Sequence, residues 1–188
     1  MSGARFTPLQ RTLHWTMAAM IVAMLFIGVG MVSTVSPRYW TLVSIHKPLG
    51  AVILLLAVLR LGLRWWRGAP ALPGDLPWWQ RAAAKASHVM LYALMIAMPL
   101  VGWSMLSAGG YPIVLYGPIH LPPIMPHDDR LYAMLRTAHT WLACLLFATF
   151  LLHFAAALFH ALVRRDGVFA SMAPWSSRKR GALPHAAE

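Results

Sequence analysis

Four apolar stretches, each at least eighteen residues long, constrain the fold of this chain more than any other feature. They run from Leu13 to Val32, from His46 to Leu63, from Ser87 to Leu106 and from Leu135 to Val163. Each is long enough to cross about 30 Å of hydrocarbon. Because an apolar segment in lipid must satisfy its backbone hydrogen bonds internally, each is expected to be helical. The sequence therefore predicts an all-α fold, a transmembrane four-helix bundle.

The composition supports a membrane protein and argues against a nucleic-acid-binding one. Hydrophobic residues make up 59% of the chain and charged residues only 11%, whereas soluble domains carry about 25% charge. The formal net charge is +11, but the basic residues lie between apolar stretches and do not cluster on one folded face, as nucleic-acid recognition requires. Membrane lipid is the predicted surrounding partner, and no nucleic acid is expected.

The distribution of Lys and Arg predicts the orientation. Twelve of the sixteen lie at the N-terminus, in the second connection with its flanks, or at the C-terminus. The other four are Arg38, Lys47, Arg130 and Arg136. The positive-inside rule therefore places both termini in the cytoplasm. We expect residues 1–174 to form the membrane domain and the charged residues 175–188 to be a disordered cytoplasmic tail.

Five histidines lie near the ends of these stretches and fall into two layers. His46 and His139 belong to the outer layer, and His14, His88 and His153 to the inner one. Ionisable side chains inside a membrane are costly, and they usually face the bundle interior and serve a function. A single histidine near a helix end is commonly an interfacial polar residue. Five in two layers favour a functional role.

The spacing between His139 and His153 predicts two sites stacked across the membrane. Fourteen residues along a helix return to within about 40° of the starting direction and rise about 21 Å. Both rings therefore point into the bundle from one face, at two depths. This arrangement suits two metal centres.

Haem fits these layers better than zinc does. A structural zinc site needs four nitrogen or sulfur ligands in one cluster, and neither layer offers four. Haem iron needs only one protein ligand on each side of the porphyrin, which two histidines from facing helices supply. The spacing alone leaves open whether His14 or His88 is the inner partner of His153.

Three glycines agree with a flat cofactor in the bundle. Gly28 follows His14 by fourteen residues and Gly102 follows His88 by fourteen, so each lies on its histidine's face at the depth of the other layer. Gly50 follows one turn after the histidine that opens the second stretch. Each could leave room for a macrocycle, although transmembrane helices also use glycine for close packing.

Five segments of the chain resemble the bacterial cytochrome b561 family, four-helix membrane cytochromes with two b-type haems. They are LQRTLHW at 9–15, SIHKPLG at 44–50, KASHVMLYALMIAMPLVGW at 85–103, AHTW at 138–141 and LLHFAAALFHALVRRDG at 151–167. The resemblance covers almost the whole chain except the C-terminal tail. It implies a multi-pass protein of the bacterial inner membrane that carries electrons.

The resemblance implies a role for each polar residue of the two layers. His46 and His139 would hold the outer haem iron, and His153 and His14 the inner one. His88 and His160 become candidates for a quinone site or for hydrogen bonds to a haem propionate. Three cations are candidates for pairing with inner propionates: Arg60, Arg64 and Arg164.

By resemblance, the expected activity is superoxide:ubiquinone oxidoreductase, with superoxide as periplasmic donor and ubiquinone as acceptor. Local positive potential steers a small anion, which makes Lys47, Arg38 and Arg136 candidates for steering superoxide. Lys47 adjoins the ligand candidate His46. These cations could instead neutralise outer propionates or lipid head groups.

Two other functions remain open at the level of sequence. A quinol-linked carrier would pass electrons outward to a periplasmic redox partner. A transporter or structural subunit would use the histidines for protons or a metal ion, but all five acidic residues are expected in loops or tails, which argues against a proton pump.

Overall fold

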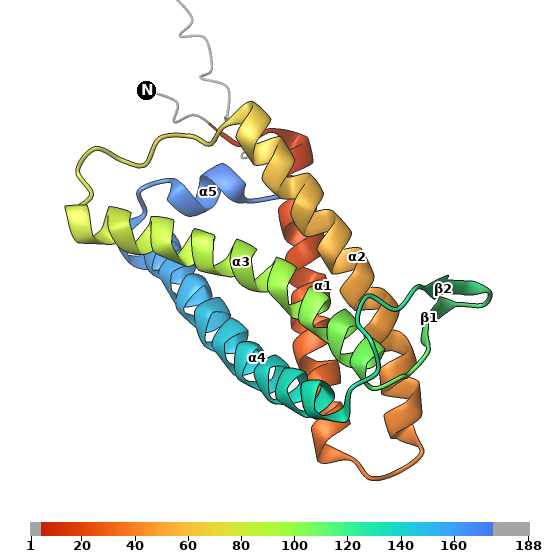
Figure 1. Cartoon of the computed structure of the whole chain (residues 1–188). Helices are drawn as coiled ribbons and strands as arrows, with labels where there is room; N and C mark the ends of the chain where they lie inside the picture. Colours follow the sequence, from red (N-terminus) through yellow and green to blue (C-terminus); the bar gives the residue numbers. More distant parts are fainter. Residues whose placement is uncertain (1–4, 175–188) are drawn as a thin grey trace, which may run out of the picture.

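The computed structural model describes residues 5–174, and these form a bundle of four long helices (Figure 1). The helices are α1 (Pro8–Ser33), α2 (Arg38–Arg67), α3 (Trp78–Ala108) and α4 (Asp129–Leu158). Helix α1 packs against α2, α3 against α4, and α2 against α3. The predicted all-α four-helix fold is confirmed, with a small hairpin added. The predicted tail, residues 175–188, lies outside the described residues.

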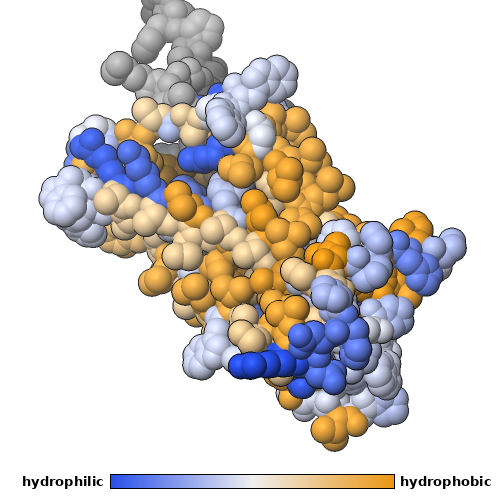
Figure 2. Space-filling model, viewed as in Figure 1, coloured by the Kyte–Doolittle hydropathy of each residue, from blue (hydrophilic) through white to orange (hydrophobic). Residues whose placement is uncertain are grey.

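The outer surface of the bundle is apolar, as a lipid-facing surface must be. All four helices are long and apolar enough to cross a membrane. Large side chains such as Phe26, Trp141 and Leu152 are more than 70% exposed. Figure 2 shows apolar side chains over the middle of the bundle and hydrophilic ones gathered toward its ends. Lipid therefore takes the place of water around the middle of this protein.

Each helix begins before the apolar stretch that predicts it, and α1, α2 and α3 also end after it. Thr7 caps α1 in a capping box with Gln10, and the Asp128 side chain accepts a hydrogen bond from the Leu131 N–H at the start of α4. Helix α2 continues through its basic last turn to Gly68, which has a φ of 72°. The apolar stretches mark the hydrocarbon part of each helix, and polar or charged turns extend it into the head-group region.

A short antiparallel hairpin occupies part of the connection between α3 and α4. Strand β1 (Ile113–Tyr116) pairs with β2 (Ile119–Leu121), and β1 packs against α2 and α3. This connection is rich in proline, which interrupts helices, and no helix runs through residues 109–128, since α3 ends at Ala108 and α4 begins at Asp129. We call this end of the bundle the hairpin end.

The opposite end holds a π-helical turn, η1 (Phe159–Arg164), and a short helix, α5 (Val168–Met172). The Trp15 indole N–H donates to the Met172 carbonyl at 2.9 Å, and the Phe6 N–H donates to the Ser171 carbonyl at 3.3 Å. Both ends of the described chain therefore lie at this α5 end (Figure 1). That it faces the cytoplasm remains a prediction.

The buried core lies between the two levels at which the histidines occur. It consists of Met17 and Ile21 of α1, Ile53 and Ala57 of α2, and Met95 of α3. Met17 and Ala57 are fully buried. This apolar layer separates the polar side chains at the two ends of the bundle.

Candidate functional site

At the hairpin end, two histidines meet inside the bundle. The ring centroids of His46 on α2 and His139 on α4 are 6.2 Å apart, with an interplanar angle of 64°. The Nδ1 atom of each ring is buried and has no hydrogen-bond partner among residues 5–174. Gly102 on α3 lies beside this pair, because a Cβ added there would be 3.3 Å from His139 Cε1. The site is thus formed by three helices.

At the α5 end, three histidines from three helices lie together. The ring centroid of His153 is 6.4 Å from that of His14 and 5.4 Å from that of His88. His14 Nδ1 is buried and has no partner in the described part of the chain. His153 Nδ1 is 3.5 Å from the hydroxyl of Ser87, a residue that the sequence analysis does not single out. Both candidate partners of His153 are therefore beside it.

Two arginines stand near this cluster without an acidic partner. The Arg60 guanidinium lies over the Tyr92 ring, 5.7 Å from its centroid, and it acts electrostatically on all three histidines of the cluster. Arg64 acts in the same way on His88. Within residues 5–174, neither arginine forms an ion pair with a carboxylate. Cations in such an apolar setting favour an anionic partner.

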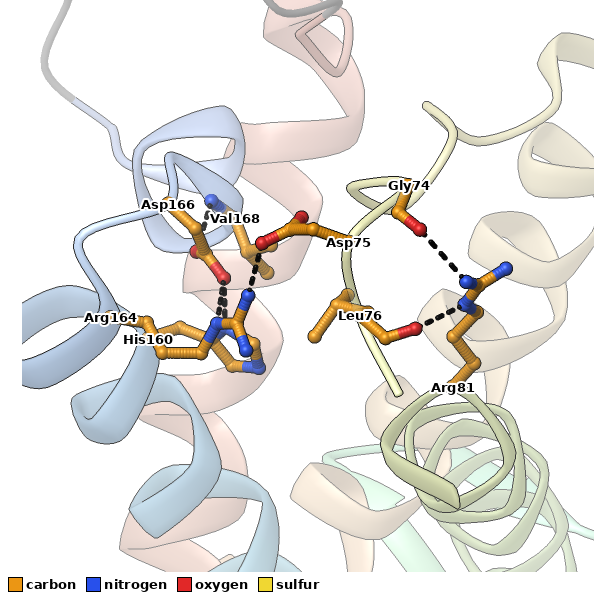
Figure 3. Close-up of polar contacts among 8 residues, drawn as sticks. All are labelled: Gly74, Asp75, Leu76, Arg81, His160, Arg164, Asp166 and Val168. Atoms are coloured by element: carbon orange, nitrogen blue, oxygen red, sulfur yellow. Dashed lines mark hydrogen bonds and ion pairs between the residues drawn. The ribbon is translucent and has the colours of Figure 1, made fainter. Parts of the chain in front are cut away.

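Four other polar side chains of the α5 end form a separate network (Figure 3). His160 Nδ1 is 2.7 Å from Asp166 Oδ2, and Arg164 Nε donates to the same oxygen at 3.0 Å. Arg164 Nη2 donates to Asp75 Oδ2 at 2.7 Å. Asp166 and Asp75 are not among the site residues that the sequence predicts. Because Arg164 is engaged by two carboxylates, its pairing with a propionate remains only a prediction.

The four cations of the hairpin end differ in what they contact. Lys47 Nζ donates to the Pro112 carbonyl at 3.1 Å, which ties α2 to the start of the hairpin. Arg38, Arg130 and Arg136 are exposed. In the described part of the chain, none of the four forms an ion pair. With only Asp128 and Asp129 as carboxylates at the start of α4, positive charge is in excess at this end within the described residues.

The other two glycines have more open surroundings than Gly102. A Cβ at Gly50 would be 3.7 Å from the terminal methyl of Met24, an ordinary contact. A Cβ at Gly28 would meet nothing within 4 Å. There is thus free space at Gly28, but its use by a cofactor remains a prediction.

Comparison with known proteins places the chain in a family. The model of the family "Prokaryotic cytochrome b561" matches residues 5–175. Two relatives from Escherichia coli K12 are named cytochrome b561 homolog 2, at 28% identity over 94% of this chain and 95% of the relative, and cytochrome b561 homolog 1, at 26% over 90% and 97%. A third, from Yersinia pestis, is named probable superoxide oxidase CybB and is 28% identical over 94% of this chain and 98% of the relative. The chain therefore belongs to the prokaryotic cytochrome b561 family of membrane electron carriers with b-type haem.

Proposed function

We propose that this protein oxidises superoxide on the periplasmic side of the inner membrane and passes the electrons to ubiquinone by way of two b-type haems. The observation that carries the proposal is the presence of histidine pairs at both ends of a membrane-spanning bundle. The name of the Yersinia pestis relative, a probable superoxide oxidase, supports the choice of donor.

The pair at the hairpin end fits a haem iron held between two imidazoles. Metal–imidazole bonds of about 2 Å put the centroids of two rings on opposite sides of one metal about 6 Å apart. The observed separation of His46 and His139 is 6.2 Å. Buried polar atoms without partners are costly, so the unpartnered ring nitrogens of His46 and His139 also favour a bound group. When bound, each haem supplies a one-electron redox centre.

At the α5 end, we assign His14 and His153 as the iron ligands. Their centroid separation of 6.4 Å is close to that of the other pair, whereas His88 is only 5.4 Å from His153. Arg60 and Arg64 would pair with the propionates of this haem, since they have no carboxylate partner in the described chain. Gly28, Gly50 and Gly102 would leave room for the macrocycles.

Superoxide would react at the hairpin end, which the positive-inside rule places in the periplasm. With both histidines as ligands, the iron would offer no position to an oxygen species, so superoxide would give up its electron without binding to the metal. Lys47, Arg38 and Arg136 would raise the local positive potential and speed the arrival of the anion. Each superoxide loses one electron and leaves as dioxygen.

Ubiquinone would be reduced at the α5 end, where His88 and His160 are the candidate hydrogen-bonding and proton-donating groups. Reduction of one quinone to quinol takes two electrons and two protons. Two superoxide ions supply the electrons, and the cytoplasmic side supplies the protons. The overall reaction converts two superoxide ions, one quinone and two protons into two dioxygen molecules and one quinol.

The decisive experiment combines haem content with electron transfer in the purified protein. We expect two haems per chain, haem reduction by a steady source of superoxide, and quinol formation that superoxide dismutase abolishes. One haem per chain would overturn the two-centre arrangement. Reduction by quinol but not by superoxide would reverse the direction and make the protein a quinol-linked carrier.

A further inference from the structure

The carboxylate of Asp166 is held by three groups from one short segment of the chain (Figure 3). His160 Nδ1 donates to its Oδ2 at 2.7 Å, and Arg164 Nε donates to the same atom at 3.0 Å. The Val168 N–H donates to Oδ1 at 3.2 Å. Both oxygens are thus engaged, and the carboxylate has a fixed orientation toward the His160 ring.

The backbone between His160 and Asp166 has an unusual course. His160 lies in η1, a π-helical turn, and such turns are rare and frequently occur at functional sites. Arg165 then takes a left-handed conformation with φ 53°, and Gly167 follows with φ 83°. A non-glycine residue with positive φ stores strain that the surrounding contacts must offset. Here the turn brings the Asp166 carboxylate back onto the His160 ring.

Burial and charge distinguish this pair from an ordinary surface ion pair. The side chains of His160 and Asp166 are 16% and 10% exposed, whereas that of Asp75 is 71% exposed. Burial raises the pKa of the Asp166 carboxyl, but the hydrogen bonds from His160, the Val168 N–H and Arg164, with the charge of His160, outweigh it and lower that pKa. Asp166 is therefore an anion and accepts a hydrogen bond from His160 Nδ1–H.

Without a second proton on the His160 ring, the network carries a net charge of −1. Asp166 and Asp75 carry one negative charge each, and Arg164, which contacts both, carries one positive charge. One further proton on the His160 ring would bring these four side chains to neutrality. The exposed Asp75 marks the side of the network that meets water.

We propose that Asp166 is a positioning residue for proton transfer to the reduced quinone, acting through His160. By accepting a hydrogen bond from Nδ1–H, the carboxylate orients the ring, and Nε2 of the doubly protonated ring is then the nitrogen that donates. The inference rests on the proposed quinone site. When electrons from superoxide have reached the quinone, the Nε2–H bond breaks and an O–H bond forms on the quinone oxygen. The ring then regains its proton from water at the α5 end.

The test replaces Asp166 by asparagine and measures quinone reduction per haem. A neutral amide in place of the carboxylate no longer balances the charge of the doubly protonated ring from which Nε2 donates, and it also loses the charge-assisted hydrogen bond that orients the ring. We expect Asp166→Asn to slow quinol formation at least about tenfold, while superoxide still reduces the haems at the unaltered rate. Asp75→Asn removes one negative charge from the same network without changing a contact of the ring, because Asp75 contacts Arg164 and not His160. It is expected to slow quinol formation less than Asp166→Asn does, and equal slowing by both variants would assign the effect to charge and not to positioning.

A double-mutant comparison separates positioning from a general structural role. In a His160→Ala background, Asp166→Asn is expected to cause no further slowing, because the two side chains act as a unit. Equal slowing in both backgrounds, or a wild-type rate in Asp166→Asn, would overturn the proposal. If the unaltered protein reduces its haems with superoxide but forms no quinol, the proposed function fails, independently of Asp166.

A measurement on the unaltered protein does not depend on the stability of any variant. Nitrogen-15 labelling of histidine, with the His160 signal assigned by its loss in His160→Gln, reports which ring nitrogen carries the proton. We expect Nδ1 to be protonated. A ring protonated only at Nε2 would contradict the proposal, since Nδ1 would then have no proton to donate to the carboxylate in a hydrogen bond.

Discussion

The ring centroid of His153 lies 5.4 Å from that of His88. This is shorter than the 6.4 Å between His153 and His14 and the 6.2 Å between His46 and His139. The two longer separations are alike, so the pair at the α5 end that repeats the ring separation of the hairpin end is His14 with His153. His88 is then an additional ring beside the pair, available to another partner.

This relationship predicts different results for two alanine variants at the α5 end. His14→Ala is expected to lower the haem content from two per chain to one, because it removes an iron ligand. His88→Ala is expected to keep both haems. Haem extraction and the reduced-minus-oxidised spectrum of the purified variants measure this. Loss of a haem from His88→Ala with retention in His14→Ala would reverse the ligand assignment.

At the hairpin end, His139→Ala is expected to remove one haem and leave the spectrum of the other intact. The ring of His139 faces only His46 among the described histidines, so no neighbouring imidazole can replace it. His120→Ala is the matched control, since His120 is exposed on β2. An unchanged haem content in the His139→Ala variant would contradict the assignment of His139 as an iron ligand.

The sequence determines the helices and the histidine levels because both follow from simple periodicity. An apolar stretch of about twenty residues has one stable form in lipid, and the rise per residue sets the depth of each histidine. The same rise puts Gly102 at the level of His139, where the structure has it. These features depend on positions along single helices.

Other features depend on how helices meet or on backbone conformations that sequence does not reveal. His14 and His88 lie on different helices, and only their packing against α4 gives their separations from His153. The contact between Asp166 and His160 depends on a left-handed Arg165, a conformation that no residue preference indicates. The sequence offers one signal for this contact: an acidic residue that lies shortly after a histidine at a helix end and directly before a glycine.

Substitution of Gly102 by alanine is expected to disturb the haem of the hairpin end alone. The added Cβ would lie 3.3 Å from His139 Cε1, so the ring must shift by a few tenths of an ångström. We expect a changed absorption band or midpoint potential for that haem, with the other unaffected. Gly62→Ala is the control, because a Cβ there meets nothing within 4 Å. Identical redox titrations of the two variants and the unaltered protein would mean that the ring tolerates the methyl group.

Lys47→Glu is expected to slow reduction of the haems by superoxide about tenfold at low ionic strength. The variant replaces an attracting charge by a repelling one beside His46. Within residues 5–174 the Lys47 ammonium group donates to the Pro112 carbonyl and to no histidine, so the absorption spectrum should not change. Because exposed charges are screened within about 10 Å at 0.1 M salt, the difference from the unaltered protein should shrink as salt is added.

Lys85→Glu changes the net charge by the same amount at the α5 end, where Lys85 is exposed. It is expected to leave the rate unchanged. Equal slowing by both variants would assign the effect to net charge, and no slowing by Lys47→Glu would reject steering by this residue.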